Sequence, residues 1–299
     1  MTHPEAPDLD SRRRGFLAGA VIGAALAART TSLTDAPSLT AALAEGPVPV
    51  PAPDGRRYAP IALGDALLEE LLSGGVDLQR LARRWVQWWH DDGLGADAAL
   101  VAALAHLEQF NAPVSALDVT GPSAIAAALP AALAAASPRT MVSGAFHTAR
   151  LLDPDPESGL AAVTLVLAAA RYLEGSRDFL PDVLSLLRSN GAPEELIDQF
   201  ADIARDPRAQ PVPPRSPNAS AMSVTLWALR VAQHRPRSAE ALSAMVAAGG
   251  VSPTAGAALG ALLGARDGID QWPATWRDGA GEDVKLRLML AERLRAGEG

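Results

Sequence analysis

The fold class can be inferred from residues 247–265, which read AAGGVSPTAGAALGALLGA. Glycines recur there at every fourth position, at Gly256, Gly260 and Gly264, and the period continues to Gly268. A glycine inside a helix costs about 1 kcal/mol relative to alanine, so a helix with a stripe of glycines needs a structural reason. The usual reason is the close approach of another backbone. The stripe therefore predicts a helix that packs tightly against a neighbour.

A second stripe lies near the N-terminus, where residues 14–26 read RGFLAGAVIGAAL and place Gly15, Gly19 and Gly23 at the same spacing. Such stripes also occur where membrane helices pair. However, the charged pair at 266–267 interrupts the C-terminal stripe, and neither apolar run reaches the roughly 20 residues that a membrane span needs. We expect the two striped helices to cross near the centre of a soluble helical bundle.

Most of the remaining sequence has helical periodicity. The clearest segment is 77–90, where Asp77 is a suitable N-cap and Leu78, Leu81 and Trp85 recur at helical spacing. No run of alternating apolar and polar residues is long enough to predict a strand. Similar patterns predict helices at 96–110, 157–173, 193–205, 219–234, 238–248 and 280–296.

The organisation of the chain is that of one domain. The proline-rich stretches 46–54 and 206–218 lie between helices of the same Ala and Leu character, so we interpret them as surface loops rather than linkers. Residues 1–10 are polar, and we expect a disordered tail there. The sequence predicts a single all-α domain over 11–299.

The composition excludes several classes of function. Of 299 residues, 48% are hydrophobic and only 4% aromatic, which favours helices over sheets. The net charge of −8 and the absence of a basic stripe argue against a nucleic-acid partner. The chain has no cysteine, which excludes disulfides, thiolate metal sites and cysteine nucleophiles. Lys285 is the only lysine, which leaves little basis for Schiff-base chemistry.

Residues 11–28 allow two interpretations. Arg13 and Arg14 precede an apolar run, as in a twin-arginine export signal of bacteria. The same run contains the first glycine stripe and could instead be the first core helix of the fold. The residues alone leave both interpretations open.

Both glycine stripes resemble signatures of the ADP-ribosylglycohydrolase family, which includes the bacterial dinitrogenase-reductase-activating glycohydrolase. The C-terminal signature of the family has G-G-D-x-D-T, then a glycine-striped helix, then Y-G-x-x-x-I-P-x-x-W. Here residues 249–254 read GGVSPT, and Gly268, Pro273 and Trp276 follow the stripe. The opening helix is similar to R-x-x-G-x-x-x-G-x-x-x-G-D-A-L. The resemblance implies the all-α fold of the family.

For the N-terminal segment, the resemblance implies that residues 14–26 form the first core helix, whose cleavage would remove part of the fold. We therefore expect a cytoplasmic protein that does not bind a membrane, with an export signal at 11–28 as the alternative.

The resemblance also implies hydrolysis of an N-glycosidic bond with two Mg²⁺ ions held by Asp and Thr side chains. The aspartates of the C-terminal motif fall on Val251 and Pro253, and only Thr254 keeps its identity. The aspartate of the first helix falls on Ala24. A T-D-D-T loop of the family falls on 58–61, or one residue later, and neither register supplies an aspartate. Because Mg²⁺ requires oxygen ligands, we predict no metal cofactor.

We expect the segments 58–63, 137–142 and 249–254 to be loops that converge on one cleft. Asp65 could reach into this cleft, or it could cap or solvate a helix at 66–72. No catalytic residue is assigned. The candidate cleft residues are Tyr58, Ala59, Pro60, Ile61, Met141, His147, Gly249, Gly250, Val251, Pro253 and Thr254.

Three functions are compatible with this pattern. The first is a non-hydrolytic homologue, a pseudoenzyme, that binds a small, nucleotide-like ligand or a protein partner in the former active-site cleft. The second is a metal-independent enzyme, for example of a biosynthetic rearrangement or cyclisation, that uses the apolar cleft. The third is a surviving hydrolase whose metal is held by other residues.

Other side chains have structural alternatives. His147 could contact a ligand or be a packed helical histidine. The tryptophans of 85–89 could stack on a base, although their helical spacing is more typical of core residues. His90 could bind an ion with the aspartates that follow it, or lie at a solvated helix end.

Overall fold

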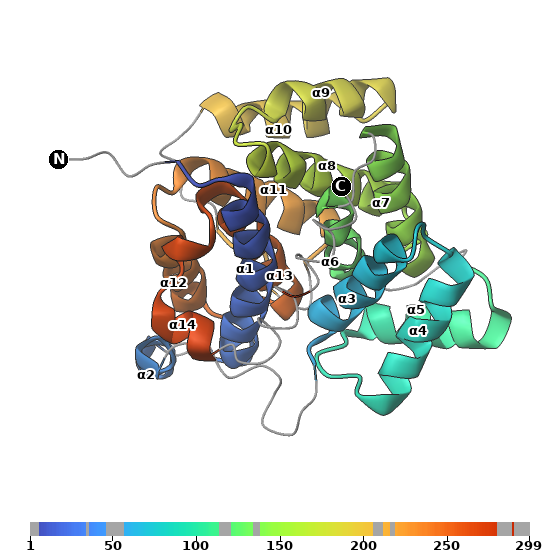
Figure 1. The fold of residues 1–299 in the computed structure, drawn as a ribbon, viewed down its shortest axis with the longest axis horizontal. Helices are drawn as coiled ribbons and strands as arrows, with labels where there is room; N and C mark the ends of the chain where they lie inside the picture. The colour runs from blue at the N-terminus through green and yellow to red at the C-terminus, as the bar shows by residue number, and fades with distance from the viewer. Residues whose placement is uncertain are drawn as a thin grey trace.

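Helices α1 (Leu9–Thr30) and α13 (Pro253–Asp267) lie side by side at the centre of the fold (Figure 1). The computed structural model describes residues 6–33, 36–45, 57–113, 121–133, 138–205, 212–215, 219–279 and 289. The other described elements are α2 (Ala36–Glu45), α3 (Ala59–Leu72), α4 (Leu78–Asp91), α5 (Ala98–Phe110), α6 (Ser123–Ala128), α7 (Pro138–Leu152), α8 (Pro156–Leu173), α9 (Leu180–Ser189), α10 (Glu194–Arg205), α11 (Ala221–His234), α12 (Ser238–Ala248), α14 (Ala274–Gly279), and the 3-10 turns η1 (Leu129–Leu133) and η2 (Ile269–Gln271).

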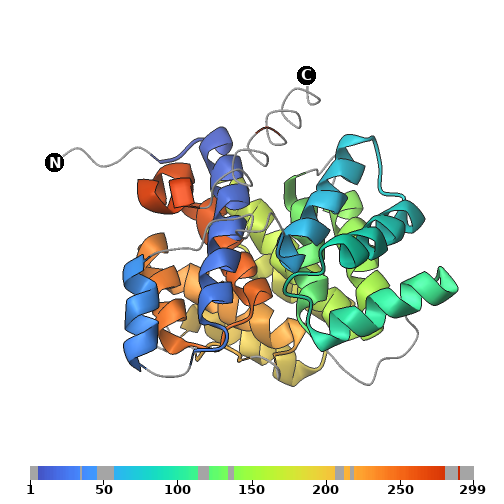
Figure 2. The same ribbon diagram turned by 90° about the horizontal axis from the view of Figure 1, so that it is seen from below.

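The other helices surround the central pair (Figures 1 and 2). Helices α2, α12 and α14 lie on one side of α1, and α3, α4 and α5 lie on the other. Helices α8 and α11 pack against α13. Within the described ranges there is no β-strand, and a single isolated bridge pairs Arg215 with Val251. The prediction of one all-α domain is confirmed.

The glycine stripes of α1 and α13 face each other in antiparallel register. A Cβ added at Gly19 would overlap the carbonyl oxygen of Gly260, and one added at Gly260 would overlap that of Gly19. The ring nitrogen of Trp272 donates to the Gly15 carbonyl at 3.3 Å and closes one end of the contact. The predicted close approach is confirmed. The other facing pairs are Gly15 with Gly264 and Gly23 with Gly256.

Most helix bounds agree with the sequence patterns. Asp77 accepts from the backbone N–H groups of Gln79 and Arg80, both at 3.0 Å, so α4 begins where the N-cap predicts. Helices α5, α8, α10, α11 and α12 begin and end within two residues of their predicted bounds. The predicted helix at 280–296 (apart from Met289), the stretch 46–54 and most of 206–218 lie outside the described residues.

Three predictions about helix starts were wrong. Asp8 accepts from the Ser11 N–H at 2.7 Å, so α1 begins at Leu9, inside the expected tail. The segments expected as loops at 58–63 and 137–142 are helical from Ala59 and from Pro138. Proline is compatible with the first turn of a helix because the N–H that it lacks has no partner there.

The described helices also bear on membrane insertion. None of them is both long enough and apolar enough to cross a bilayer.

A buried carboxylate fixes α3 to α4. The side chain of Glu70 is 1% exposed, and its oxygens accept from Nε of Arg80 at 2.7 and 2.8 Å. Arg84 approaches the same carboxylate at 3.6 Å. The Arg80 hydrogen bonds hold the pKa of Glu70 below its ordinary value of 4.5, although burial opposes them.

We expect Glu70→Gln to lower the free energy of unfolding by about 2 kcal/mol at neutral pH, because it removes charge-assisted hydrogen bonds. A lowered carboxyl pKa stabilises the fold above the unfolded-state value and loses this effect as pH falls through the folded-state value. Urea denaturation should therefore give a difference between wild type and variant that shrinks below pH 4.5. The control is Glu69→Gln, whose exposed carboxylate should contribute little. A difference independent of pH would contradict this account.

Candidate ligand-binding site

The N-terminal ends of α3 and α13 meet at the turn between α4 and α5. The backbone N–H of Ala59 donates to the Leu94 carbonyl at 2.8 Å. A Cβ at Gly95 would lie 3.3 Å from the ring of Tyr58 and 4.0 Å from Pro253. Two of the three segments predicted to share a cleft are therefore brought together. We call this region the α3–α13 junction; it comprises residues 58–61, 93–96 and 249–254.

Most of the positions where the resemblance places metal ligands are buried, and all of them except Tyr58 and Thr254 carry apolar side chains. Ala24 of α1, Ile61 of α3 and Val251 are 0% exposed, and Thr254 is 4% exposed. The first three belong to one continuous hydrophobic cluster. Methyl and methylene groups thus fill the interior of the fold at these positions.

The residues of the α3–α13 junction do not fit a pair of Mg²⁺ ions. Mg²⁺ takes oxygen ligands, usually including one or two carboxylates. Of the positions compared with the family's ligands, only Thr254 carries the expected side-chain oxygen, and one hydroxyl is not a dimetal site. Across the described part of the chain, no group of three or more His, Cys, Asp or Glu side chains is placed to hold a metal ion.

Two carboxylates near the junction contact Arg57 instead. Oδ2 of Asp92 accepts from the Arg57 backbone N–H at 2.5 Å. Oδ2 of Asp65 lies 3.9 Å from Nη1 of Arg57. Asp65 is 5% exposed and lies within α3, so the expectation that it caps or solvates a shorter helix was wrong. Because α3 begins at Ala59, Asp65 falls in its second turn rather than at its start.

The segment 249–254 is held against the end of α1. Gly249 and Gly250 have positive φ angles of 66° and 69°, which glycine adopts readily. The N–H of Gly250 donates to the Thr30 carbonyl at 3.2 Å. The hydroxyl of Thr31 donates to the Val251 carbonyl at 2.9 Å. The backbone groups of this segment therefore stabilise the fold.

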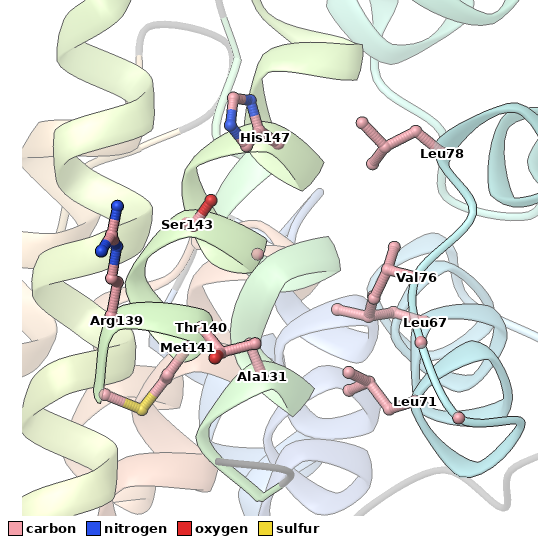
Figure 3. Close-up of a pocket in the computed structure, with 13 residues that line it drawn as sticks. Leu67, Leu71, Val76, Leu78, Ala131, Arg139, Thr140, Met141, Ser143 and His147 are labelled. Atoms are coloured by element: carbon pink, nitrogen blue, oxygen red, sulfur yellow. The ribbon is translucent and has the colours of Figure 1, made fainter. Parts of the chain in front are cut away.

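A cavity of about 670 Å³ lies between α7 and the C-terminal end of α3 (Figure 3). One wall is apolar and consists of Leu67 and Leu71 of α3, Val76 of the following turn, and Leu78 of α4. In Figure 3, Leu67, Leu71 and Leu78 point across the cavity toward α7. The volume is within the roughly 300–1,000 Å³ typical of small-molecule sites.

Helix α7 supplies the opposite wall, which carries a polar stripe. Arg139, Ser143 and His147 are four residues apart and therefore lie on one side of the helix. All three line the cavity and are exposed. Within the described residues, Arg139 and Ser143 form no side-chain hydrogen bond or ion pair. The stripe can thus donate hydrogen bonds to a ligand that lies against the apolar wall.

Gly144 keeps this cavity open. It lies inside α7 and lines the cavity, and a Cβ added there would meet no atom within 4 Å. No backbone approaches it, in contrast to the glycines of α1 and α13. The pattern of the sequence missed this role, and the only signal was a lone glycine within a helix.

This cavity does not bring together all the residues predicted to share a cleft. Met141 and His147 line the cavity, whereas no residue of 58–63 or 249–254 is among its lining residues. His147 is exposed, so the packed-histidine alternative was wrong.

The remaining candidates have structural roles. Trp85 is fully buried and donates from its ring nitrogen to the Leu63 carbonyl at 3.1 Å, as expected for a core residue. His90 is exposed, and its Nε2 lies 2.7 Å from Oε1 of Glu108. This contact joins α4 to α5.

Comparisons with known proteins agree with the fold. The sequence profile of the ADP-ribosylglycohydrolase family matches residues 5–299. A solved structure described as an "ADP-ribosylglycohydrolase-related protein complex" superposes with a TM-score of 0.70 at 20% identity, covering 96% of this chain and 99% of the other. No curated protein matches the sequence significantly. The chain belongs to the ADP-ribosylglycohydrolase family.

Proposed function

We propose that this protein is a non-hydrolytic member of the family that has lost the dimetal site and binds a small, nucleotide-like ligand. The observation that carries the proposal is the burial of Ala24, Ile61 and Val251 where metal ligands would be needed. Metal-assisted hydrolysis needs a cation that orients the substrate and activates water. Apolar side chains cannot hold such a cation. No metal cofactor enters the proposed function.

We assign the ligand to the cavity between α7 and α3. Its apolar wall suits a base or another flat, weakly polar group, and its polar stripe suits an acceptor-rich or anionic group. The guanidinium of Arg139 can form charge-assisted hydrogen bonds with such a group. His147 is in reach of the same ligand because both residues lie on one side of α7.

A metal-independent enzyme is the weaker alternative. General acid–base chemistry usually needs two groups that exchange protons with the substrate. His147 lines the cavity, but no carboxylate does among its described lining residues. Ligand binding without catalysis therefore accounts for the side chains that line the cavity, because it does not require a second proton-transfer group.

We also propose that residues 11–28 remain in the working protein, which acts in the cytoplasm. Residues 15–27 are buried in the core, and Gly15, Gly19 and Gly23 contact α13. Removal of this segment would expose the apolar face of α13. A fraction of the protein exported and shortened at this segment would contradict the proposal.

The ligand proposal is tested by titrating ADP-ribose, NAD and adenosine, each with and without Mg²⁺, into wild type and Gly144→Leu. We expect at least one compound to bind wild type without Mg²⁺. Gly144→Leu should weaken that binding by about tenfold or more, because its side chain occupies space that a small-molecule site needs.

The matched control is Gly144→Ala, which adds one methyl group and should keep most of the affinity. Thermal unfolding checks that both variants fold. Equal affinity in wild type and Gly144→Leu would place the ligand elsewhere. Absence of binding by all three compounds would contradict the nucleotide-like ligand.

A further inference from the structure

A second cavity, of about 330 Å³, lies where the N-terminal end of α1 meets the C-terminal ends of α8 and α13. It shares no lining residue with the larger cavity. Three arginines line it, namely Arg12, Arg177 and Arg266. Asp267 is the one acidic residue among its described lining residues. This excess of positive charge contrasts with a chain whose net charge is −8.

The buried Arg266 is already neutralised within the fold. Its side chain is 1% exposed, and its Nε donates to Oδ1 of Asp267 at 2.8 Å. Its Nη1 donates to the Arg235 carbonyl at 2.7 Å and also contacts the Ala232 carbonyl. Asp267 in turn accepts from the Ser238 hydroxyl at 2.6 Å. These groups form a complete structural network that leaves little capacity for a ligand.

Arg12 and Arg177 are not neutralised to the same extent. Arg177 reaches Asp267 only at 3.4 Å, and its side chain is 61% exposed. Arg12 forms no side-chain hydrogen bond or ion pair within the described residues, and its Nε is buried without a partner. Its guanidinium lies against Gly175, where a Cβ would come within 2.9 Å of Nη1. Gly175 thus leaves room for the Arg12 guanidinium beside the cavity.

The helix dipoles do not cancel this charge. The C-terminal ends of α8 and α13 each bring about half a negative charge, and the N-terminal end of α1 brings about half a positive charge. The positive charge of the Arg12 and Arg177 guanidinium groups exceeds the net negative charge of these three helix ends. A phosphate group carries oxygens that match the planar donors of arginine.

We propose that this cavity is an anion site in which Arg12 and Arg177 bind a phosphate group, either as inorganic phosphate or as part of a phosphate ester. The proposal does not depend on the ligand of the larger cavity. The partially exposed cavity gives access from solvent, since Arg177 lies at its rim.

The test is calorimetric titration of the full chain with inorganic phosphate, pyrophosphate and adenosine monophosphate. We expect saturable binding that weakens as salt is raised. The double variant R12Q/R177Q should lose about tenfold or more in affinity, because both charge-assisted contacts are removed. Tighter binding of adenosine monophosphate than of both inorganic anions would identify an ester as the ligand.

The control is R83Q/R188Q, which removes the same charge from exposed positions on α4 and α9 and should bind as wild type does. Gly144→Leu should also leave phosphate binding unchanged, which separates this site from the larger cavity. Circular dichroism confirms that the variants fold. No binding by any probe, or equal affinity in R12Q/R177Q and wild type, would overturn the proposal.

Discussion

Replacing Gly19 or Gly260 by alanine is expected to destabilise the fold by about 3 kcal/mol or more, because overpacking against a backbone cannot be relieved by moving a side chain. Each added Cβ would overlap the carbonyl oxygen of the facing glycine. The effect is large against the total stability of about 5–15 kcal/mol of a folded domain. Urea denaturation followed by circular dichroism measures it directly.

The matched control is the same substitution in α7. Gly144→Ala places its Cβ in open space, and we expect it to stabilise the protein by about 1 kcal/mol through helix propensity. The two substitutions are chemically identical and should have opposite signs. If Gly19→Ala were neutral, the close packing of α1 on α13 would be contradicted.

Arg266→Met is expected to destabilise the protein by about 3 kcal/mol, because it breaks a buried pair with Asp267. Asp267 would then keep only the longer contact to the exposed Arg177 and the Ser238 hydrogen bond. The change also removes the donor to the Arg235 carbonyl at the end of α11. Methionine keeps the apolar volume of the side chain, so the loss reports on charge and hydrogen bonding rather than on a cavity. Chemical denaturation at neutral pH measures the change.

A second arginine provides the comparison for this prediction. Arg237 is 75% exposed and pairs with Glu240 at 2.8 Å on the surface of α12. Arg237→Met should have little effect, because exposed ion pairs are screened by solvent. Similar losses for Arg266→Met and Arg237→Met would contradict the structural role given to the buried network.

The central packing could be predicted from the sequence because it depends on backbone chemistry. A glycine in a helix lowers helix stability, and a close contact with another backbone explains why it is present. The stripes at Gly15–Gly23 and Gly256–Gly268 therefore predict such a contact. The N-cap at Asp77 was equally readable, because a short carboxylate before an apolar period satisfies free backbone N–H groups. Such signals are local and need no knowledge of the neighbours.

The starts of α3 and α7 could not be read in the same way. Loops were expected there from the family resemblance, but Pro60 and Pro138 both fall in the first turn of a helix, where proline is tolerated. Met141 and His147 of α7 line the cavity beside α3, and no residue of 249–254 is among its lining residues. The helical structure of these two segments is therefore the part of the site that the sequence did not predict.

The cavity itself depends on tertiary structure. Leu67 and Leu78 fit an ordinary apolar helix face, and nothing in their spacing indicates that part of this face lacks a covering helix. Gly144 was the one readable signal, since a glycine in a helix without a facing backbone leaves space. Arg12 and Arg177 are far apart in sequence, and only the fold brings them to one cavity.

The family's fold is retained here, while the positions compared with its metal ligands include the buried apolar side chains of Ala24, Ile61 and Val251. This combination is tested most directly by calorimetric titration of Mg²⁺ into protein freed of metal with a chelator. We predict no saturable binding up to millimolar Mg²⁺, because Ala24, Ile61 and Val251 offer no side-chain oxygen. Saturable binding of one or two Mg²⁺ ions per chain would contradict the proposed loss of the dimetal site.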